Sequence, residues 1–279
     1  MDETSLFIAA CLLLIGGSIA GTFAGFLGIG GAFILIPLQF LILTYMGYPP
    51  DIAMKTAIAT TLCFTFPIAL NSAYNHSKKG TVLWKKSALI GANGFVFSFI
   101  GAYIAAFLSA AALSIIFGFI VLATSIKTKT TAKKENEDES RISTNPVSYI
   151  ICGMLMGLAS GLVGIGGGLI LIPLMIFLLK FPTRNAVGSS SAAIVFTSAG
   201  GVCGYLISGM GIENPIPYAI GYINPVFWVL LFVSGIVFSR FGVSLSHKTD
   251  PKKIRHVFSI LTFLIGSFMI INGAALWIG

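Results

Sequence analysis

The chain has 279 residues, of which only 9% are charged and 56% are hydrophobic. An ordinary soluble domain carries about 25% charged residues, so a soluble globule cannot hide this much apolar surface. Disorder requires low hydrophobicity and is excluded for the bulk of the chain, and four cysteines are too few for a disulfide-stapled fold. The composition therefore predicts an all-α membrane protein that crosses the bilayer several times.

The net charge of +8 does not indicate a nucleic-acid partner, because the lysines and arginines form short runs between apolar stretches. The four cysteines lie within apolar stretches and form no C-x-x-C pair. The sequence contains no metal-ligand cluster, no redox pair and no nucleophile–base signature. We therefore expect no enzyme, no cofactor and no metal site.

Ten apolar segments approach or exceed the length of about 20 residues that a transmembrane helix needs. They are 5–27, 32–46, 56–75, 87–108, 110–126, 147–163, 168–180, 189–208, 223–240 and 256–278. Two of them, 32–46 and 168–180, are unusually short, and each follows directly on a glycine-rich stretch.

The positive charges predict which side of the membrane each loop lies on. If the N-terminus is outside and each segment reverses the side, the inside loops and their flanks hold 16 of the 17 lysines and arginines. Lys55 alone is left outside. Such an excess is typical of cytoplasmic loops. The N-terminus has no basic stretch before its first apolar run, so we expect the first helix to be retained rather than cleaved.

The chain contains an internal repeat. Residues 21–38 read GTFAGFLGIGGAFILIPL and residues 157–174 read GLASGLVGIGGGLILIPL, with 11 of 18 positions identical at an offset of 136. Further on, Pro49 pairs with Pro182 after a slip of three residues. The predicted units are an N-terminal repeat, 1–126, a flexible and polar cytoplasmic linker, 127–146, and a C-terminal repeat, 147–279.

Each repeat holds five apolar segments. Because five is odd, the second repeat enters the membrane from the side opposite to the first. The sequence thus predicts two inverted five-segment repeats, an architecture common among secondary transporters.

The glycine-rich stretches are the first candidate site. Glycines break helices and let backbone approach a ligand closely, and unwound backbone inside a bilayer is tolerated only where protein or a water-filled cavity receives it. The short segment after each break offers a helix N-terminus, which favours an anion. Close helix packing through small residues is the alternative. The glycines expected to bind substrate are Gly28, Gly30, Gly31, Gly164, Gly166 and Gly167.

Hydroxyl groups follow the proline-containing turn in both repeats. Thr56 and Thr60 in the first repeat, with Ser189 and Ser190 in the second, could donate hydrogen bonds to an oxyanion without the cost of burying a charge. Hydrogen bonding between helices, or back to the helix backbone, is the alternative.

Two cations lie beside these stretches. Lys55 immediately precedes Thr56, and Arg184 lies in the corresponding loop of the second repeat. They could attract an anion at the two mouths of a pathway as gate or vestibule residues. Ordinary snorkelling at the membrane interface is the alternative.

The paired G-x-x-G-I-G-G elements, each continuing to Ile-Pro and then to a proline-containing turn, resemble the TauE/SafE family of sulfite exporters. The resemblance covers about residues 16–278 and extends to Pro37 and Pro173 after the glycines. It implies a transporter of a prokaryotic cytoplasmic (inner) membrane for small sulfur-containing anions such as sulfite, sulfoacetate or related organosulfonates. Lys55 stands where the second repeat has Gly188, so the two gates need not be chemically equivalent.

We therefore expect a secondary transporter that exports a small sulfur-containing anion by alternating access, with that anion and the lipid bilayer as its partners. The sequence does not decide whether the protein forms a homo-oligomer. A passive anion channel or an importer of the same fold, and a membrane sensor that transports nothing, are the alternatives. Saturable flux with counterflow distinguishes a carrier from a channel, and a sensor would give no flux.

Overall fold

The structure is a computed structural model that describes residues 3–27, 31–130, 142–246 and 251–278. Within these ranges the chain forms ten helices. They are α1 (Glu3–Leu27), α2 (Ala32–Tyr45), α3 (Pro50–Lys78), α4 (Trp84–Phe107), α5 (Ala110–Thr130), α6 (Pro146–Val163), α7 (Gly168–Phe177), α8 (Thr183–Gly209), α9 (Pro225–Ser246) and α10 (Pro251–Ile278). They follow the ten apolar segments in order, which confirms the prediction of an all-α protein with about ten segments.

Seven of these helices are long and apolar enough to cross a membrane. The shorter apolar helices are α2, α7 and the apolar part of α5. At about 1.5 Å per residue, α2 spans only about 21 Å and α7 about 15 Å, less than the roughly 30 Å of the hydrocarbon core. The chain is therefore a multi-pass membrane protein in which α2 and α7 are too short to cross alone.

Both α3 and α8 begin six residues before the apolar segments that predicted them, at Pro50 and Thr183. Each follows a proline in nearly the same conformation, Pro49 with φ −55° and ψ 132°, and Pro182 with φ −56° and ψ 143°. Hydropathy missed the first turns because they are polar. The prediction that Arg184 lies in a loop is therefore wrong, because Arg184 is the second residue of α8.

The stretch predicted to be a flexible linker is partly ordered. Helix α5 continues to Thr130, and at the other end the Ser143 N–H donates a hydrogen bond to the Leu179 carbonyl at 3.0 Å. Ile142 is buried beside them. Both ends of the predicted linker therefore have regular local structure, while residues 131–141 lie outside the described residues.

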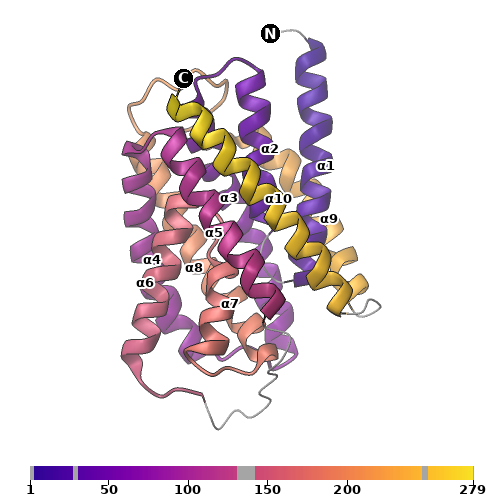
Figure 1. Cartoon of the computed structure of the whole chain (residues 1–279), viewed down its shortest axis with the longest axis vertical. Helices are drawn as coiled ribbons and strands as arrows, with labels where there is room; N and C mark the ends of the chain where they lie inside the picture. The colour runs from indigo at the N-terminus through magenta and orange to yellow at the C-terminus, as the bar shows by residue number, and fades with distance from the viewer. Residues whose placement is uncertain (1–2, 28–30, 131–141, 247–250, 279) are drawn as a thin grey trace.

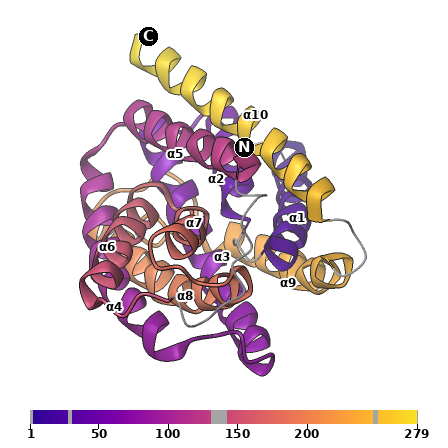
Figure 2. The same ribbon diagram turned by 60° about the horizontal axis from the view of Figure 1, so that its bottom comes forward.

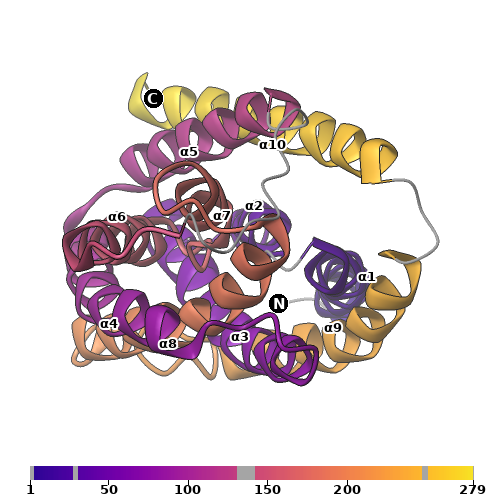
Figure 3. The ribbon, with the colours of Figure 1, turned by 90° about the horizontal axis from the view of Figure 1, so that it is seen from below.

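Helix α3 is the most enclosed of the membrane-spanning helices. In α3, 78% of the apolar window is buried inside the protein, against 33% in α9 and in α10. Figure 3 shows α2 and α7 surrounded by the other helices. The outer helices pack in pairs, α1 with α9, α4 with α6 and α5 with α10, while α8 packs against both α4 and α3.

The two ends of the molecule carry different elements. In Figure 1 the N- and C-termini lie at the same end, called here the terminal end. Helices α3 and α5 begin there, because Pro50, Ala110 and Trp277 line one cavity. Helices α4 and α8 begin at the opposite end, called the linker end, where Leu83 is hydrogen-bonded to Ser189. Figure 2 brings this end forward and shows α7 beside α5, α6 and α8.

Close approach between helices depends on glycines spaced four residues apart, which allow two backbones to touch. Two interfaces, α1 with α9 and α6 with α4, have such glycines, and a Cβ atom added to any of them would overlap the facing helix. In α1 they are Gly17, Gly21 and Gly25, against Leu231, Gly235 and Ser239 of α9; in α6 they are Gly153, Gly157 and Gly161, against Ile90, Gly94 and Ser98 of α4.

Candidate functional site

The second glycine-rich stretch is a sharp break between α6 and α7. Gly164 ends α6 with φ 72°, and Gly167 precedes α7 with φ 80°. Between them, Gly166 also has a positive φ of 70°. Such values disfavour any side chain with a Cβ. The glycines therefore let the chain turn back on itself within a few residues and start α7.

This break lies about halfway along the two long helices α3 and α8. A Cβ atom added to Gly164 would come nearest to Ile58 and Ile36, and one added to Gly166 would come nearest to Thr65 and Ile194. Thr65 is near the middle of α3, and Ile194 is near the middle of α8. The N-terminus of α7, whose first N–H groups have no partner within the helix, is therefore located deep in the protein. A positive helix dipole end at this depth is suited to a small anion.

A threonine hydroxyl fixes the break to α8. The Thr197 Oγ1 donates to the carbonyl oxygen of Gly166 at 3.0 Å. The Gly167 carbonyl accepts from the N–H groups of Ile170 and Leu171 at 3.1 and 2.9 Å, which begins the hydrogen bonding of α7. The position of the α7 N-terminus is thus set by a hydrogen bond from α8 and by the glycine conformations.

The first glycine-rich stretch has a matching last residue. Gly31 precedes α2 with φ 65° and lies against Ala20 of α1, just as Gly167 precedes α7 and lies against Met156 of α6. Gly167 follows Gly31 by 136 residues, and Met156 follows Ala20 by the same number. The described parts of the two breaks therefore share one local geometry. The remaining predicted glycines of this stretch, which lie outside the described residues, are Gly28 and Gly30.

The two predicted threonines of α3 lie on the side that faces the start of α9. Thr60 Oγ1 accepts a hydrogen bond from the Asn224 N–H at 3.0 Å, and Asn224 in turn caps α9 by accepting from the Phe227 N–H at 3.0 Å. Thr56 is fully buried, and its Oγ1 has no hydrogen-bond partner among the described residues. The Thr60 hydroxyl therefore has a structural hydrogen bond, whereas the Thr56 hydroxyl has none among the described residues.

The two predicted serines of α8 are both buried and both hydrogen-bonded. Ser189 Oγ accepts from the Leu83 N–H at 3.0 Å, at the start of α4. Ser190 Oγ donates back to the Val187 carbonyl at 2.9 Å within α8. The hydroxyl bonded to the α6–α7 break is instead that of Thr197. Thr65 also lies beside Gly166, but it presents its methyl group, and its Oγ1 donates to the Thr61 carbonyl at 2.8 Å. The structure thus does not gather the four predicted hydroxyls around the break.

Gln39 of α2 is a buried polar residue that the sequence analysis missed. Its Nε2 donates to Thr61 Oγ1 at 2.7 Å and to the Ala57 carbonyl at 3.4 Å, while its Oε1 has no partner among the described residues. The amide in the short apolar segment 32–46 was the available signal, because intramembrane polar groups are costly and often functional. Nothing comparable marked Thr65 or Thr197, whose importance depends on which face of the helix they occupy.

The two predicted vestibule cations differ in exposure. Lys55 is only 9% exposed and has its Nζ 5.9 Å from the ring centroid of Tyr222. Arg184 is exposed at the linker end. No group of three or more His, Cys, Asp or Glu side chains in the described part of the chain could hold a metal ion.

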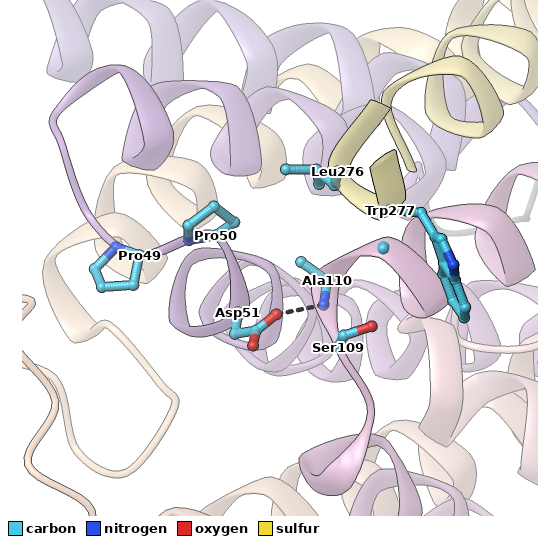
Figure 4. Close-up of a pocket in the computed structure, with 8 residues that line it drawn as sticks. Pro49, Pro50, Asp51, Ser109, Ala110, Leu276 and Trp277 are labelled. Carbon is cyan, nitrogen blue, oxygen red and sulfur yellow. Dashed lines mark hydrogen bonds between the residues drawn. The ribbon is translucent and has the colours of Figure 1, made fainter. Parts of the chain in front are cut away.

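A cavity of about 450 Å³ opens at the terminal end, between the starts of α3 and α5 and the end of α10 (Figure 4). Asp51 Oδ1 accepts from the Ala110 N–H at 2.6 Å on its wall, and so caps α5. Ser109 and Trp277 also line it. None of the predicted site residues lines this cavity, so it lies apart from the glycine breaks.

The comparison with known proteins agrees with this architecture. Residues 13–269 match the profile of the family "Sulfite exporter TauE/SafE". The chain belongs to the TauE/SafE family. A "Probable membrane transporter protein" of Methanocaldococcus jannaschii is 32% identical over 96% of this chain and 98% of its own length. A Haemophilus influenzae protein of that name is 27% identical over 95% and 99%. The Bacillus subtilis protein YunE, named in the same way, is 26% identical over 94% and 97%.

This full-length similarity confirms the resemblance that the glycine motifs indicated, and it places the TauE/SafE protein among membrane transporters. No solved structure matches the chain.

Proposed function

We propose that this TauE/SafE protein is a secondary transporter that exports a small sulfur-containing anion, such as sulfite or an organosulfonate, by alternating access. The observation that carries the proposal is the position of the α6–α7 break. It presents a helix N-terminus halfway along α3 and α8, where Gly166 lies against Thr65 and Ile194. Discontinuous helices whose N-termini face an anionic group near the bilayer midplane are a recurring feature of secondary transporters.

The helix contacts support two inverted repeats, 1–126 and 147–279, joined by 127–146. If α1–α5 correspond to α6–α10, the pairing of α1 with α9 corresponds to that of α6 with α4, and the pairs α5–α10 and α3–α8 correspond to themselves. Single residues follow the same rule. Gly25 lies against the Ser239 carbonyl, and Gly161 lies against the Ser98 carbonyl. Reciprocal contacts of this kind are what a two-fold axis between the halves requires.

The charges support an orientation with the N-terminus outside. The loop between α3 and α4 at the linker end is flanked by four lysines, whereas Lys55 lies near the terminal end. By the positive-inside rule the linker end is cytoplasmic. We accordingly place the protein in the cytoplasmic membrane of a prokaryote.

In this proposal the anion binds between the two glycine breaks. The unpaired N–H groups at the start of α7, and by repeat symmetry those at the start of α2, contact its oxygens, with Gly28, Gly30, Gly31, Gly164, Gly166 and Gly167 giving the backbone access. Nearby hydroxyls add donors without adding charge. Thr197 is the hydroxyl that is bonded directly to the described break, through the Gly166 carbonyl.

The substrate class comes from the family description and is tested directly by ligand binding. A ligand that binds the folded protein raises its apparent stability by mass action. Purified protein is melted with sulfite, sulfate, thiosulfate, sulfoacetate, taurine or acetate at equal ionic strength. The proposal expects selective stabilisation by sulfite or an organosulfonate. Stabilisation by acetate alone, or by none of the sulfur compounds, would overturn the proposed substrate class.

A further inference from the structure

A buried cation, Lys55, lies in the second turn of α3. Lys55 is 9% exposed, and the group that faces its Nζ is the ring of Tyr222, 5.9 Å away. The carboxylate one turn earlier, Asp51, uses its Oδ1 to accept the Ala110 N–H. A buried ammonium is unfavourable unless an anion or several hydrogen bonds compensate for its lost hydration.

Two buried hydroxyls near Lys55 also lack partners. Thr56 is the next residue in α3, and Tyr205 of α8 packs edge-to-face on Tyr222 with 6.1 Å between ring centroids. Thr56 Oγ1 and Tyr205 OH have no hydrogen-bond partner among the described residues, and both residues are fully buried. Most buried polar groups in proteins are paired, so two unpaired buried hydroxyls on elements beside a buried cation need an explanation.

The polar groups gathered here are all able to donate hydrogen bonds. An ammonium can only donate, and phenol and threonine hydroxyls donate readily to a charged oxygen. Burial raises the pKa of Tyr222, and the charge of Asp51 raises it further, so the Tyr222 hydroxyl stays protonated. Three elements, α3, α8 and the loop before α9, therefore contribute donors of hydrogen bonds.

We propose that Lys55, Thr56, Tyr205 and Tyr222 form a binding site for a small oxyanion at the terminal end of the protein. The class of ligand is one with several equivalent oxygens on one centre, as in sulfite or a sulfonate. The inference deepens the proposed function, on which it rests, by adding a second anion position outside the glycine breaks.

The other half of the protein does not repeat this site. Lys55 corresponds to Gly188, where an added Cβ atom would meet Thr81. Thr56 corresponds to Ser189, whose hydroxyl accepts a hydrogen bond from the Leu83 N–H. At the linker end the position of Lys55 is therefore taken by a glycine, and the equivalent hydroxyl is occupied. The structure thus predicts one such anion position per chain, at the terminal end.

Tyr205→Phe tests the site because its two effects have opposite sign. Removing an unpaired buried hydroxyl should leave the melting temperature of the ligand-free protein unchanged or higher. The dissociation constant of the stabilising anion should rise about tenfold or more, the usual loss for a hydrogen bond to a charged group. Thr56→Val should behave in the same way. Tyr103→Phe, an exposed tyrosine of α4, is the matched control and should change neither quantity.

Binding is measured by thermal titration of the purified full-length variants with sulfite and with sulfoacetate. A Tyr205→Phe protein that melts lower but binds with wild-type affinity would overturn the proposal, because the hydroxyl would then be a structural group. Wild-type protein that is stabilised by neither anion would also overturn it. Anion transport by the wild-type protein in liposomes is measured separately. Flux with unchanged binding in both variants would leave the proposed function standing and remove only this site.

Discussion

Gly118 of α5 and Gly266 of α10 lie against each other reciprocally. A Cβ atom added to Gly118 would come 2.7 Å from the Gly266 carbonyl oxygen, and one added to Gly266 would come 3.0 Å from the Gly118 carbonyl oxygen. The next neighbours are also exchanged, because Gly118 meets Ile270 and Gly266 meets Leu122, one turn further along each helix. Self-complementary contacts of this kind are expected where a two-fold axis passes between two equivalent helices.

The proposed two-fold symmetry predicts that glycines in equivalent interfaces are equally intolerant of a side chain. Gly21→Ala and Gly157→Ala should each lower the melting temperature, because the new methyl group would overlap the backbone of Gly235 or Gly94. Overpacking of this kind costs about 1–3 kcal/mol. Gly16→Ala is the control, since the atom it meets is the end of the flexible Leu38 side chain. Equal melting temperatures for Gly16→Ala and Gly21→Ala would argue against the described α1–α9 packing.

The hydroxyls expected to bind substrate should separate into two groups by stability. Thr60→Val and Ser189→Ala remove the acceptors of the Asn224 and Leu83 N–H groups. A buried donor left unpaired costs about 1–3 kcal/mol, so both variants should melt at lower temperature. Thr56→Val should not, because Thr56 Oγ1 has no partner to lose. Thermal melts without ligand decide this, and a strong destabilisation by Thr56→Val would contradict the described geometry.

The α6–α7 break should tolerate no side chain at its last glycine. Gly167→Ala forces a Cβ into φ 80° and onto Met156, whereas Gly80→Ala has the same problem of backbone conformation, at φ 67°, but meets nothing within 4 Å. The conformational cost is about 1–2 kcal/mol in each variant. Only Gly167→Ala should also displace the start of α7. Anion flux in liposomes should fall for Gly167→Ala and persist for Gly80→Ala, and equal flux would count against the break as the site.

Orientation can be tested by labelling single cysteines. In a variant without Cys11, Cys63, Cys152 and Cys203, an exposed cysteine is introduced as Lys79→Cys at the linker end or Glu213→Cys in the α8–α9 loop. With the N-terminus outside, a membrane-impermeant maleimide added to intact cells should label only the second variant. Labelling of the first variant alone would reverse the proposed topology.

Much of this architecture could be predicted from sequence because apolar length and glycine clusters act locally. The short segments 32–46 and 168–180 correspond to α2 and α7, and the positive φ of Gly31 and Gly167 matches the predicted helix breaks. Helix starts were less accurate. The polar first turns of α3 and α8 lower the hydropathy there, so the sequence predicts a loop at Arg184, which is helical in the structure.

The composition of the candidate site could be predicted only in part, because neighbours in sequence point to different helices. Thr60 faces the start of α9, while Thr61 binds Gln39 of α2 and Thr65 lies against Gly166. A hydroxyl-rich stretch identifies α3 as important without saying which face meets the break. That information comes from packing between helices distant in sequence, as does the burial of Lys55.

The most direct test of the account is counterflow of radiolabelled sulfite in liposomes that contain the purified protein. Vesicles are loaded with unlabelled sulfite or with sulfoacetate, and the entry of labelled sulfite is followed without any other gradient. An alternating-access carrier should give transient accumulation of label above its equilibrium level, and Gly167→Ala should abolish this accumulation. Entry that only approaches equilibrium, or no entry at all, would contradict the assignment of this protein as a carrier of sulfur-containing anions.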